Sequence, residues 1–313
     1  MRFALSTSWF AEPASGDEVV DKALELGFDG LEIGYRLGAA LVPAIAARVG
    51  KGEIAVQSVH AFGPVPEDVK AGHPELHHIA DTDEDKRKLA VEKVLGVLES
   101  ARSIGALAVV LHAGRVKEVF APWAWVHGRI AAERARGLVF RIRRKRMEAL
   151  RAQLLPTYMD ALRKSLDELL PSFSGAGVDL CLENLPSWDA IPQPDEAATL
   201  MRDYSGSALR CWYDIGHGQV MENAGKGTMA GAARDLADYI RGVHIHDVCG
   251  PAGDHQAPGM GGIDFASVSF FAGPQYIRVF EPAAGIPAQD LASGLALLKR
   301  IWPDEQISPG QRP

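Results

Sequence analysis

Eight short apolar runs alternate with helical patterns along almost the whole chain of 313 residues. Each run is nearly continuous in hydrophobic residues and short, which is typical of parallel β-strands covered by helices on both faces. Eight strand–helix units match the number in a closed (β/α)₈ barrel, so the sequence predicts an α/β chain that forms a single such barrel. The predicted strands are residues 2–8, 30–34, 54–60, 107–112, 178–183, 209–215, 240–247 and 276–281.

The alternative arrangement of the same elements is an open, doubly wound parallel sheet. That fold places a glycine-rich dinucleotide-binding turn directly after its first strand. The corresponding residues 6–10 of this chain read Ser-Thr-Ser-Trp-Phe and contain no glycine. We therefore favour the closed barrel over the open sheet.

The connection between the fourth and fifth predicted strands is much longer than the other connections. It predicts a helical insertion at about residues 114–172 within a single domain. We expect the barrel itself to span residues 1–303 and to be followed by a C-terminal tail at 304–313. The insertion is therefore interpreted as an extended loop and helix of the barrel, not as a second domain.

The helical pattern of the insertion runs from roughly residue 131 to residue 170. We expect a break near Pro156, because proline removes a helical hydrogen bond and its ring crowds the preceding turn. A basic run, Arg-Ile-Arg-Arg-Lys-Arg at 141–146, predicts a solvated helix face or a contact between subunits of a homo-oligomer. The alternative is a lid or a patch that binds a phosphorylated ligand.

Charge, hydropathy and cysteine spacing argue against several classes of protein. The chain has 33 Lys and Arg against 40 Asp and Glu, so it lacks the overall basic field of a nucleic-acid-binding protein. No apolar run reaches the roughly 18 residues of a membrane helix, and the N-terminus lacks the apolar core of a signal peptide. The three cysteines form no Cys-x-x-Cys pair, which argues against a disulfide framework or a zinc ribbon. We expect a cytoplasmic protein without a membrane or nucleic-acid partner.

Polar residues gather where the predicted strands end. Nearly every strand from the third to the eighth ends in His, Asp or Glu, and six of the ten histidines lie at these ends or just beyond them. Chemistry in a (β/α)₈ barrel takes place at the C-terminal ends of the strands. The residues concerned are His60, His112, Glu183, Asp214, His217, His244, His246, Asp247, His255 and Glu281.

Four of these residues predict a divalent metal site. Glu183, Asp214, His244 and Glu281 come from four different strands and can converge above the barrel axis. Imidazole nitrogen and carboxylate oxygen together suit Mn, Zn, Co or Fe better than Ca, which prefers oxygen alone. Without a cation, so many buried carboxylates would repel one another and their pKa values would rise.

The sequence motifs at these positions resemble those of the xylose isomerase-like TIM-barrel superfamily. This superfamily contains sugar and sugar-phosphate isomerases and epimerases, inosose dehydratases, hydroxypyruvate isomerases and apurinic endonucleases of the Endonuclease IV type. The resemblance covers nearly the whole chain except the insertion. The motifs are Leu-Glu-Asn at 182–184, Asp-Ile-Gly-His at 214–217, His-Ile-His-Asp at 244–247, Asp-His-Gln-Ala-Pro-Gly-Met-Gly at 254–261 and Phe-Glu-Pro at 280–282.

The resemblance implies roles for individual residues. It implies that the four residues named above bind the metal, and that Glu183 and Glu281 also act as catalytic acid and base. It further implies that His217 contacts the substrate and that Glu32 corresponds to the family carboxylate after the second strand, another substrate-binding position. The family loop reads Gly-Glu-Gly where this chain has Met260 between two glycines.

The endonucleases of this superfamily hold three zinc ions with additional histidines. His60, His112, His217 and His255 stand at corresponding places, although Asp254 is one residue out of register with the endonuclease aspartate. These residues are therefore candidates for extra metal ions. The alternative, which we favour, is that His60, His112 and His255 bind the substrate around a single ion.

The sequence as a whole predicts a divalent-metal-dependent isomerase or epimerase of a small sugar or sugar-like carbonyl compound. The reaction would proceed by proton abstraction and an enediolate, with Mn, Zn, Co or Fe preferred over Mg. The alternatives are a multinuclear metal phosphodiester hydrolase and a metal-dependent dehydratase or lyase. A glycine-rich stretch at 250–262 is a candidate for binding the phosphate of a sugar phosphate.

Overall fold

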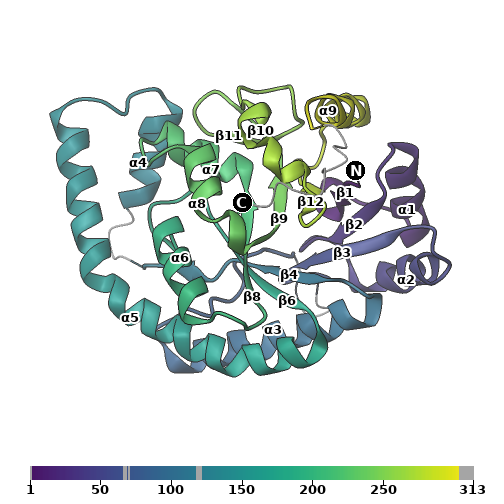
Figure 1. Ribbon diagram of the computed structural model, residues 1–313. Helices are drawn as coiled ribbons and strands as arrows, with labels where there is room; N and C mark the ends of the chain where they lie inside the picture. The colour runs from purple at the N-terminus through teal and green to yellow at the C-terminus, as the bar shows by residue number, and fades with distance from the viewer. Residues whose placement is uncertain (1, 66–68, 70, 118–121, 303–313) are drawn as a thin grey trace, which may run out of the picture.

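The centre of the molecule is a closed barrel of eight parallel strands (Figure 1). A computed structural model describes residues 2–65, 69, 71–117 and 122–302. Neighbouring strands follow the order β1-β12-β9-β8-β6-β4-β3-β2, and pairing between β1 and β12 closes the barrel. These strands are β1 (Ala4–Ser6), β2 (Gly30–Ile33), β3 (Ala55–His60), β4 (Ala108–Leu111), β6 (Asp179–Glu183), β8 (Leu209–Asp214), β9 (Ile240–Ile245) and β12 (Ile277–Phe280).

Each barrel strand lies inside one of the eight predicted runs, which confirms the predicted fold class. The helices outside the barrel begin and end at residues suited to those positions. The side chain of Asp83 accepts hydrogen bonds from the first turn of α3, and Gly105 ends that helix with a φ of 74°. The helices are α1 (Gly16–Glu25), α2 (Val42–Gly50), α3 (Glu84–Ile104), α6 (Pro194–Asp203), α7 (Ile215–Asn223), α8 (Met229–Asp235) and α9 (Ala288–Ile301), with short 3₁₀ turns η1 (Thr7–Trp9), η2 (Ala39–Leu41), η3 (Ala237–Tyr239) and η4 (Phe265–Ala272).

The interior of the barrel is apolar at the N-terminal ends of the strands and polar at the C-terminal ends. Alternate residues of a strand point inward, so one strand contributes several interior side chains at different heights. Trp212 is 1% exposed and packs against Gly242, where an added Cβ would clash with the indole ring. The Trp212 ring also contacts the imidazole of His244, with ring centres 5.2 Å apart. Trp212 therefore forms the floor beneath the polar end of the barrel.

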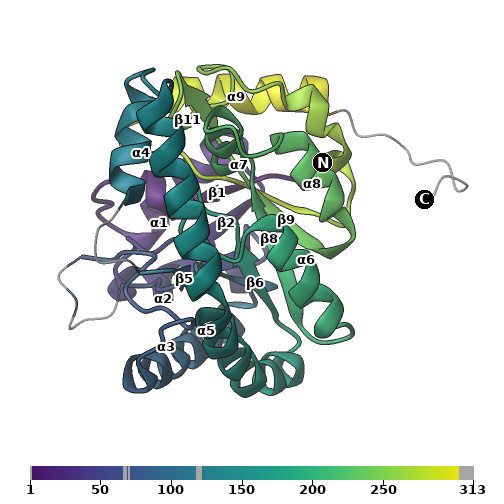
Figure 2. The same cartoon turned by 90° about the vertical axis from the view of Figure 1, so that its left-hand side faces the viewer.

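The described part of the long connection after β4 contains two helices. These are α4 (Pro122–Ala131) and α5 (Leu138–Ala176), which run side by side in Figure 2. A short antiparallel pair, β5 (Gly114–Arg115) with β7 (Ala190–Ile191), lies beside them. A second antiparallel pair, β10 (Asp247–Cys249) with β11 (Gly253–Gln256), follows β9 at the C-terminal end of the barrel.

The predicted break of the insertion helix at Pro156 is wrong. Helix α5 continues for 39 residues with both Pro156 and Pro171 inside it. Each proline leaves the carbonyl four residues earlier, at Ala152 and Asp167, without its helical partner. All four residues are exposed, so water can satisfy these carbonyl groups and the helix continues.

The basic run in α5 packs partly on aromatic rings. The guanidinium of Arg143 lies 4.6 Å from the centre of the Trp125 ring, and that of Arg144 lies 5.6 Å from the centre of the Trp188 ring. These cation–π contacts are made within the chain, so the predicted subunit contact and the alternative phosphate-binding patch stay predictions. The predicted C-terminal tail at 304–313 lies outside the described residues. Within the part of the chain that is described, none of the helices has the length and apolar character needed to cross a bilayer.

Candidate metal centre

The structure brings the four predicted metal ligands together at the C-terminal end of the barrel. One possible ligand atom from each of Glu183, Asp214, His244 and Glu281 lies within 4.8 Å of the others. Glu183 and Asp214 end strands β6 and β8, His244 is near the end of β9, and Glu281 follows β12 directly. All four side chains are buried, with at most 3% exposure.

His244 lies at the centre of this group and faces carboxylates on both sides of its ring. Its Nδ1 is 3.2 Å from Glu183, 3.2 Å from Glu281 and 3.7 Å from Asp214. Its Nε2 is 3.1 Å and 3.2 Å from the two carboxylate oxygens of Glu32. A neutral imidazole carries one hydrogen, so it cannot donate to both sides. The Nδ1 side therefore requires a proton or a metal cation.

Glu281 is the carboxyl group whose charge is least favoured. Burial raises its pKa, as does repulsion from Glu183 and Glu32, and the pKa reaches about 8 although His244 opposes the shift. Glu281 is therefore protonated at neutral pH unless a further positive charge is present. A divalent cation supplies such a charge.

The other two carboxylates are held in their charged form. Burial by itself raises the pKa of Glu183, but the charge of His244 outweighs it and the pKa lies well below the ordinary value. The same balance, with His217 as the main favourable charge, lowers the pKa of Asp214. Charged carboxylate oxygens beside an imidazole nitrogen are the donors that Mn, Zn, Co and Fe accept. The residues present therefore fit a divalent transition metal.

Two further histidines contact Glu183 from its other side. His60 Nε2 lies 3.2 Å and His112 Nε2 lies 3.1 Å from the same oxygen, Oε2. His60 Nδ1 is 2.8 Å from the carbonyl oxygen of Ala61, so that nitrogen carries the ring hydrogen and donates it. In a neutral His60 the Nε2 lone pair would then face a carboxylate. This contact is favourable only when a proton or another cation lies between the two atoms.

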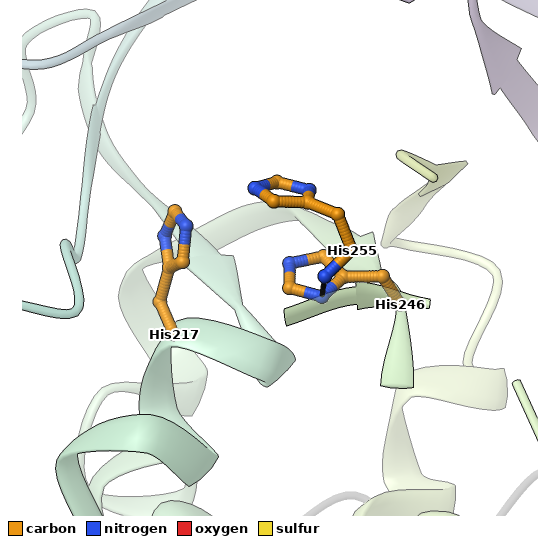
Figure 3. A group of neighbouring side chains, drawn as sticks. All are labelled: His217, His246 and His255. Carbon is orange, nitrogen blue, oxygen red and sulfur yellow. Dashed lines mark hydrogen bonds between the residues drawn. The ribbon is translucent and has the colours of Figure 1, made fainter. Parts of the chain in front are cut away.

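A third group consists of His217, His246 and His255 (Figure 3). His217 Nδ1 is 3.0 Å from the carbonyl of Asn184, and His255 Nδ1 is 2.9 Å from the carbonyl of Glu281. Both nitrogens donate to these carbonyls, so each ring keeps Nε2 for another partner. The rings of His246 and His255 are stacked, with centres 4.1 Å apart.

The charges of these rings differ. Burial, with His246 and His217, lowers the pKa of His255 to about 4, so this ring is neutral. Burial opposes the charge of His217, but Asp214 and Glu183 outweigh burial and raise its pKa to about 10. His217 therefore offers a charged donor beside the neutral ring of His255.

His246 is held differently from the other two histidines. Its Nδ1 accepts a hydrogen bond from the backbone N–H of His255 at 2.9 Å, drawn as a dashed line in Figure 3. Its Nε2 lies 3.0 Å from Asp214 Oδ2. Because Nδ1 accepts, Nε2 must carry the ring hydrogen, and it donates that hydrogen to Asp214.

The sequence motifs assign no role to His246, although it stands at a strand end. Its position two residues after His244 is the available signal, because residues i and i+2 of a strand point to the same side. The third group of ligand atoms within the described residues contains His246 and not the predicted Asp254. Glu32, expected to bind the substrate, lies with both oxygens beside His244 and is fully buried.

Asp247 organises the glycine-rich loop that follows β9. Its Oδ2 accepts the backbone N–H groups of Gly259 and Gly261, both at 2.9 Å, and its Oδ1 accepts those of Val248 and Ile263. An added Cβ on Gly261 would clash with the carbonyl oxygen of Val248, so the close approach requires glycine. These amide groups are already bound to a carboxylate and do not form a phosphate cradle.

Three solved structures illustrate folds similar to this one. They are a D-tagatose 3-epimerase-like protein (21% identity, TM-score 0.68, covering 96% of this chain and 97% of that chain), 3-keto-D-glucoside 4-epimerase from E. coli in its apo form (19%, 0.68, 96% and 99%), and D-psicose 3-epimerase with D-tagatose from Clostridium cellulolyticum H10 (15%, 0.68, 96% and 99%). At these identities the likeness establishes the fold. A comparison with curated protein sequences finds no match.

The sequence itself matches a family described as xylose isomerase-like TIM barrel over residues 20–273. This match covers most of the chain and includes β2 to β9 with their connections. It agrees with the closed barrel of eight strands and with the motifs at the strand ends. The protein therefore belongs to the xylose isomerase-like TIM-barrel family of enzymes, as its motifs predict.

Proposed function

We propose that the protein is a divalent-metal-dependent isomerase or epimerase that acts on a small sugar or sugar-like carbonyl compound. The convergence of Glu183, Asp214, His244 and Glu281 at the end of the barrel carries this proposal. The similar structures named above include epimerases of D-psicose and of a 3-keto-D-glucoside, which supports a sugar as the substrate class.

The four converging residues would hold the cation. A bound divalent ion supplies Lewis acidity, which makes a C–H group next to a carbonyl more acidic and stabilises the resulting enediolate. Mn, Zn, Co and Fe suit this donor set better than Mg, because Mg prefers oxygen ligands and retains water.

Glu183 and Glu281 would transfer the proton. They approach the same point from β6 and β12, and their environments move their pKa values apart. This separation belongs to the metal-free site, and a bound cation would favour the charged form of Glu281 as well, so that either glutamate could act as the base. One of the two would remove a proton from the substrate carbon, and the other, after taking up a proton from solvent, would return one to the same or a neighbouring carbon. A positioned acid or base contributes roughly 10²–10⁴-fold to the rate.

The surrounding histidines would bind the hydroxyl groups of the substrate. His217 and His255 each have Nδ1 fixed by a backbone carbonyl, which leaves Nε2 for a substrate oxygen. His60 and His112 lie on the other side of Glu183 with Nε2 directed at its Oε2, and these Nε2 atoms would bind a neighbouring hydroxyl by exchanging that contact for one with the substrate. In this proposal a single ion occupies the site and the additional histidines set the orientation of the sugar.

Solvent deuterium uptake tests the proposal. The purified protein is loaded with Mn²⁺ or Co²⁺ and incubated in D₂O with keto- and aldo-sugars, free and phosphorylated. We expect deuterium at the carbon next to the carbonyl of one substrate class, and loss of uptake in Glu281→Gln and Glu183→Gln. A matched control, Glu222→Gln, changes a carboxylate outside the site that accepts the backbone N–H of Met229. Uptake that persists in both site variants would exclude the two glutamates from proton transfer.

A multinuclear metal phosphodiester hydrolase is the second candidate. The observation that favours it is the presence of two further groups of mutually close ligand atoms, namely His60 with Glu183 and His244, and His217 with His246 and His255. The hydrogen bonds of His246 argue against the second group, because both of its ring nitrogens already have partners.

The number of metal ions distinguishes the two candidates. One ion per chain, measured by elemental analysis after loading and gel filtration, favours the isomerase or epimerase. Three ions, together with cleavage of a phosphodiester or of apurinic DNA, favour the hydrolase. A dehydratase or lyase could use the same four residues, and release of water or of a fragment would identify it by mass spectrometry of the products.

A further inference from the structure

Glu32 lies behind His244, on the side of the ring opposite to Glu183 and Glu281. Both carboxylate oxygens of Glu32 are within 3.2 Å of His244 Nε2, whereas His244 Nδ1 faces the other two carboxylates. We infer that Glu32 is a positioning residue, which keeps the ring hydrogen of His244 on Nε2 and so directs the Nδ1 lone pair to the cation. This inference rests on the proposed function.

The barrel register explains how Glu32 reaches His244. Glu32 points inward from β2, where it pairs with Ser6 of β1 and Ser58 of β3. Strands β2 and β9 are not neighbours, because β1 and β12 lie between them in the barrel. The contact between Glu32 and His244 therefore crosses the interior of the barrel, just above the floor formed by Trp212.

Ser58 fixes the carboxylate of Glu32. The Ser58 hydroxyl donates to Glu32 Oε2 at 2.8 Å, and both residues are fully buried. The pairing between β2 and β3 shifts by one residue between Leu31 and Glu32, which places Ser58 directly opposite Glu32. Glu32 thus holds a defined orientation before any ligand binds.

The role of Glu32 follows from the single hydrogen that a neutral His244 ring carries. An ionised carboxylate accepts hydrogen bonds and donates none, so Glu32 favours a hydrogen on His244 Nε2. The other neutral tautomer would point the Nε2 lone pair at the charged Glu32 and would block Nδ1 with a hydrogen. A carboxylate behind a metal-binding histidine also makes the imidazole a better donor, and loss of such a partner typically weakens metal affinity about 10–100-fold.

The position of Glu32 argues against two other roles. Glu32 belongs to none of the three groups of mutually close ligand atoms in the described residues. Its oxygens are occupied by His244 and Ser58, and the side chain is fully buried, so it has no free edge for a substrate hydroxyl. Its contribution therefore acts through His244.

Metal titration of the full-length protein tests the inference. The protein is stripped of metal and titrated with Mn²⁺ in a calorimeter. Glu32→Leu removes the acceptor at similar size, and we expect about a 10–100-fold loss of affinity with the number of sites unchanged. Glu32→Gln keeps an acceptor oxygen without the charge and should lose less, and Ser58→Ala should lose least. Glu75→Gln is the matched control, because Glu75 lies 3.7 Å from a different imidazole, that of His112, and should leave the affinity unchanged.

A spectroscopic measurement separates positioning from a general structural effect. In the Zn²⁺-loaded protein with ¹⁵N-labelled histidine, His244 should show a metal-bound Nδ1 and a slowly exchanging Nε2–H, assigned through contacts with the Trp212 ring. In Glu32→Gln this hydrogen should exchange faster while the fold, followed by circular dichroism, is retained. This readout remains available if Glu32→Leu does not fold.

The outcomes distinguish failure of the inference from failure of the proposed function. Wild-type protein that binds Mn²⁺ with an affinity unchanged in folded Glu32→Leu, or a Zn²⁺-bound His244 that coordinates through Nε2, overturns the role of Glu32 alone. Wild-type protein that binds no divalent ion overturns the proposed metal site and the role of Glu32 together.

Discussion

His246 donates its ring hydrogen to Asp214 across 3.0 Å, and its other ring nitrogen accepts the backbone N–H of His255. A second donor, the backbone N–H of His217, reaches Asp214 Oδ1 at 2.6 Å. Asp214 is therefore fixed from two directions before a cation binds. Together with Glu32 behind His244, this arrangement means that two of the four candidate ligands are oriented by buried neighbours with defined hydrogen positions.

The first prediction concerns His246. His246→Ala should lower the affinity for the first divalent ion by about tenfold, because Asp214 loses a partner that orients it, and should leave the number of ions per chain unchanged. Calorimetric titration with Mn²⁺, combined with elemental analysis, measures both quantities. A loss of one ion per chain would instead identify His246 as a ligand of a second cation.

The second prediction concerns the pH dependence of stability in the metal-free protein. Folding raises the pKa of Glu281 from the ordinary 4.5 to about 8. The folded state therefore holds a proton that the unfolded state releases, and the stability from this proton is lost as the pH rises through that interval. Between about pH 5 and pH 8, the free energy of unfolding should therefore fall by a few kcal/mol less in Glu281→Gln than in the wild type.

Urea denaturation at several pH values measures this difference. Subtracting the profile of Glu281→Gln from that of the wild type isolates Glu281, because His217 and His255 titrate in both proteins. Parallel profiles across the whole interval would show that Glu281 does not carry the proton.

The third prediction concerns the loop that Asp247 organises. Asp247 is 1% exposed and its carboxylate accepts four backbone N–H groups. Asp247→Ala should lower the free energy of unfolding by roughly 2–4 kcal/mol, since hydrogen bonds to a charged group contribute more than neutral ones and the amides lose their partner. Asp247→Asn keeps one acceptor oxygen and should cost less. Equal stability of all three proteins would contradict this role for Asp247.

The fourth prediction compares two glycines. An added methyl group at Gly242 would clash with the Trp212 ring, and Gly242→Ala should cost about 1–3 kcal/mol through overpacking. Gly96 lies within α3 with nothing within 4 Å of an added Cβ, so Gly96→Ala should stabilise by up to about 1 kcal/mol. Thermal denaturation of the two variants should therefore give shifts of opposite sign. A shift of the same sign would contradict the packing described for Trp212.

The barrel and the convergence of four ligands could be predicted from local pattern. The apolar runs predict the strands, and the polar residues at their C-terminal ends predict the position of the candidate site. Helix ends at glycine, such as Gly105, were equally visible. Each signal is carried by residues close together in the chain, and closure of the barrel then brings the four strand ends together, so one sequence suffices to predict both features.

The contacts that orient the ligands could not be predicted in this way. The contact between Glu32 and His244 depends on the diameter of the barrel and on a one-residue register shift between β2 and β3. The continuity of α5 through Pro156 depends on which face of the helix meets water. Both are properties of the assembled fold.

The position of Trp212 determines from which side a ligand can reach the candidate site. Its ring lies in the interior directly under His244 and closes the candidate site toward the N-terminal ends of the strands. A reactant and the compound made from it must then enter and leave from the side of the C-terminal ends of the strands. In the proposed function, the product would therefore have to leave before the next substrate enters.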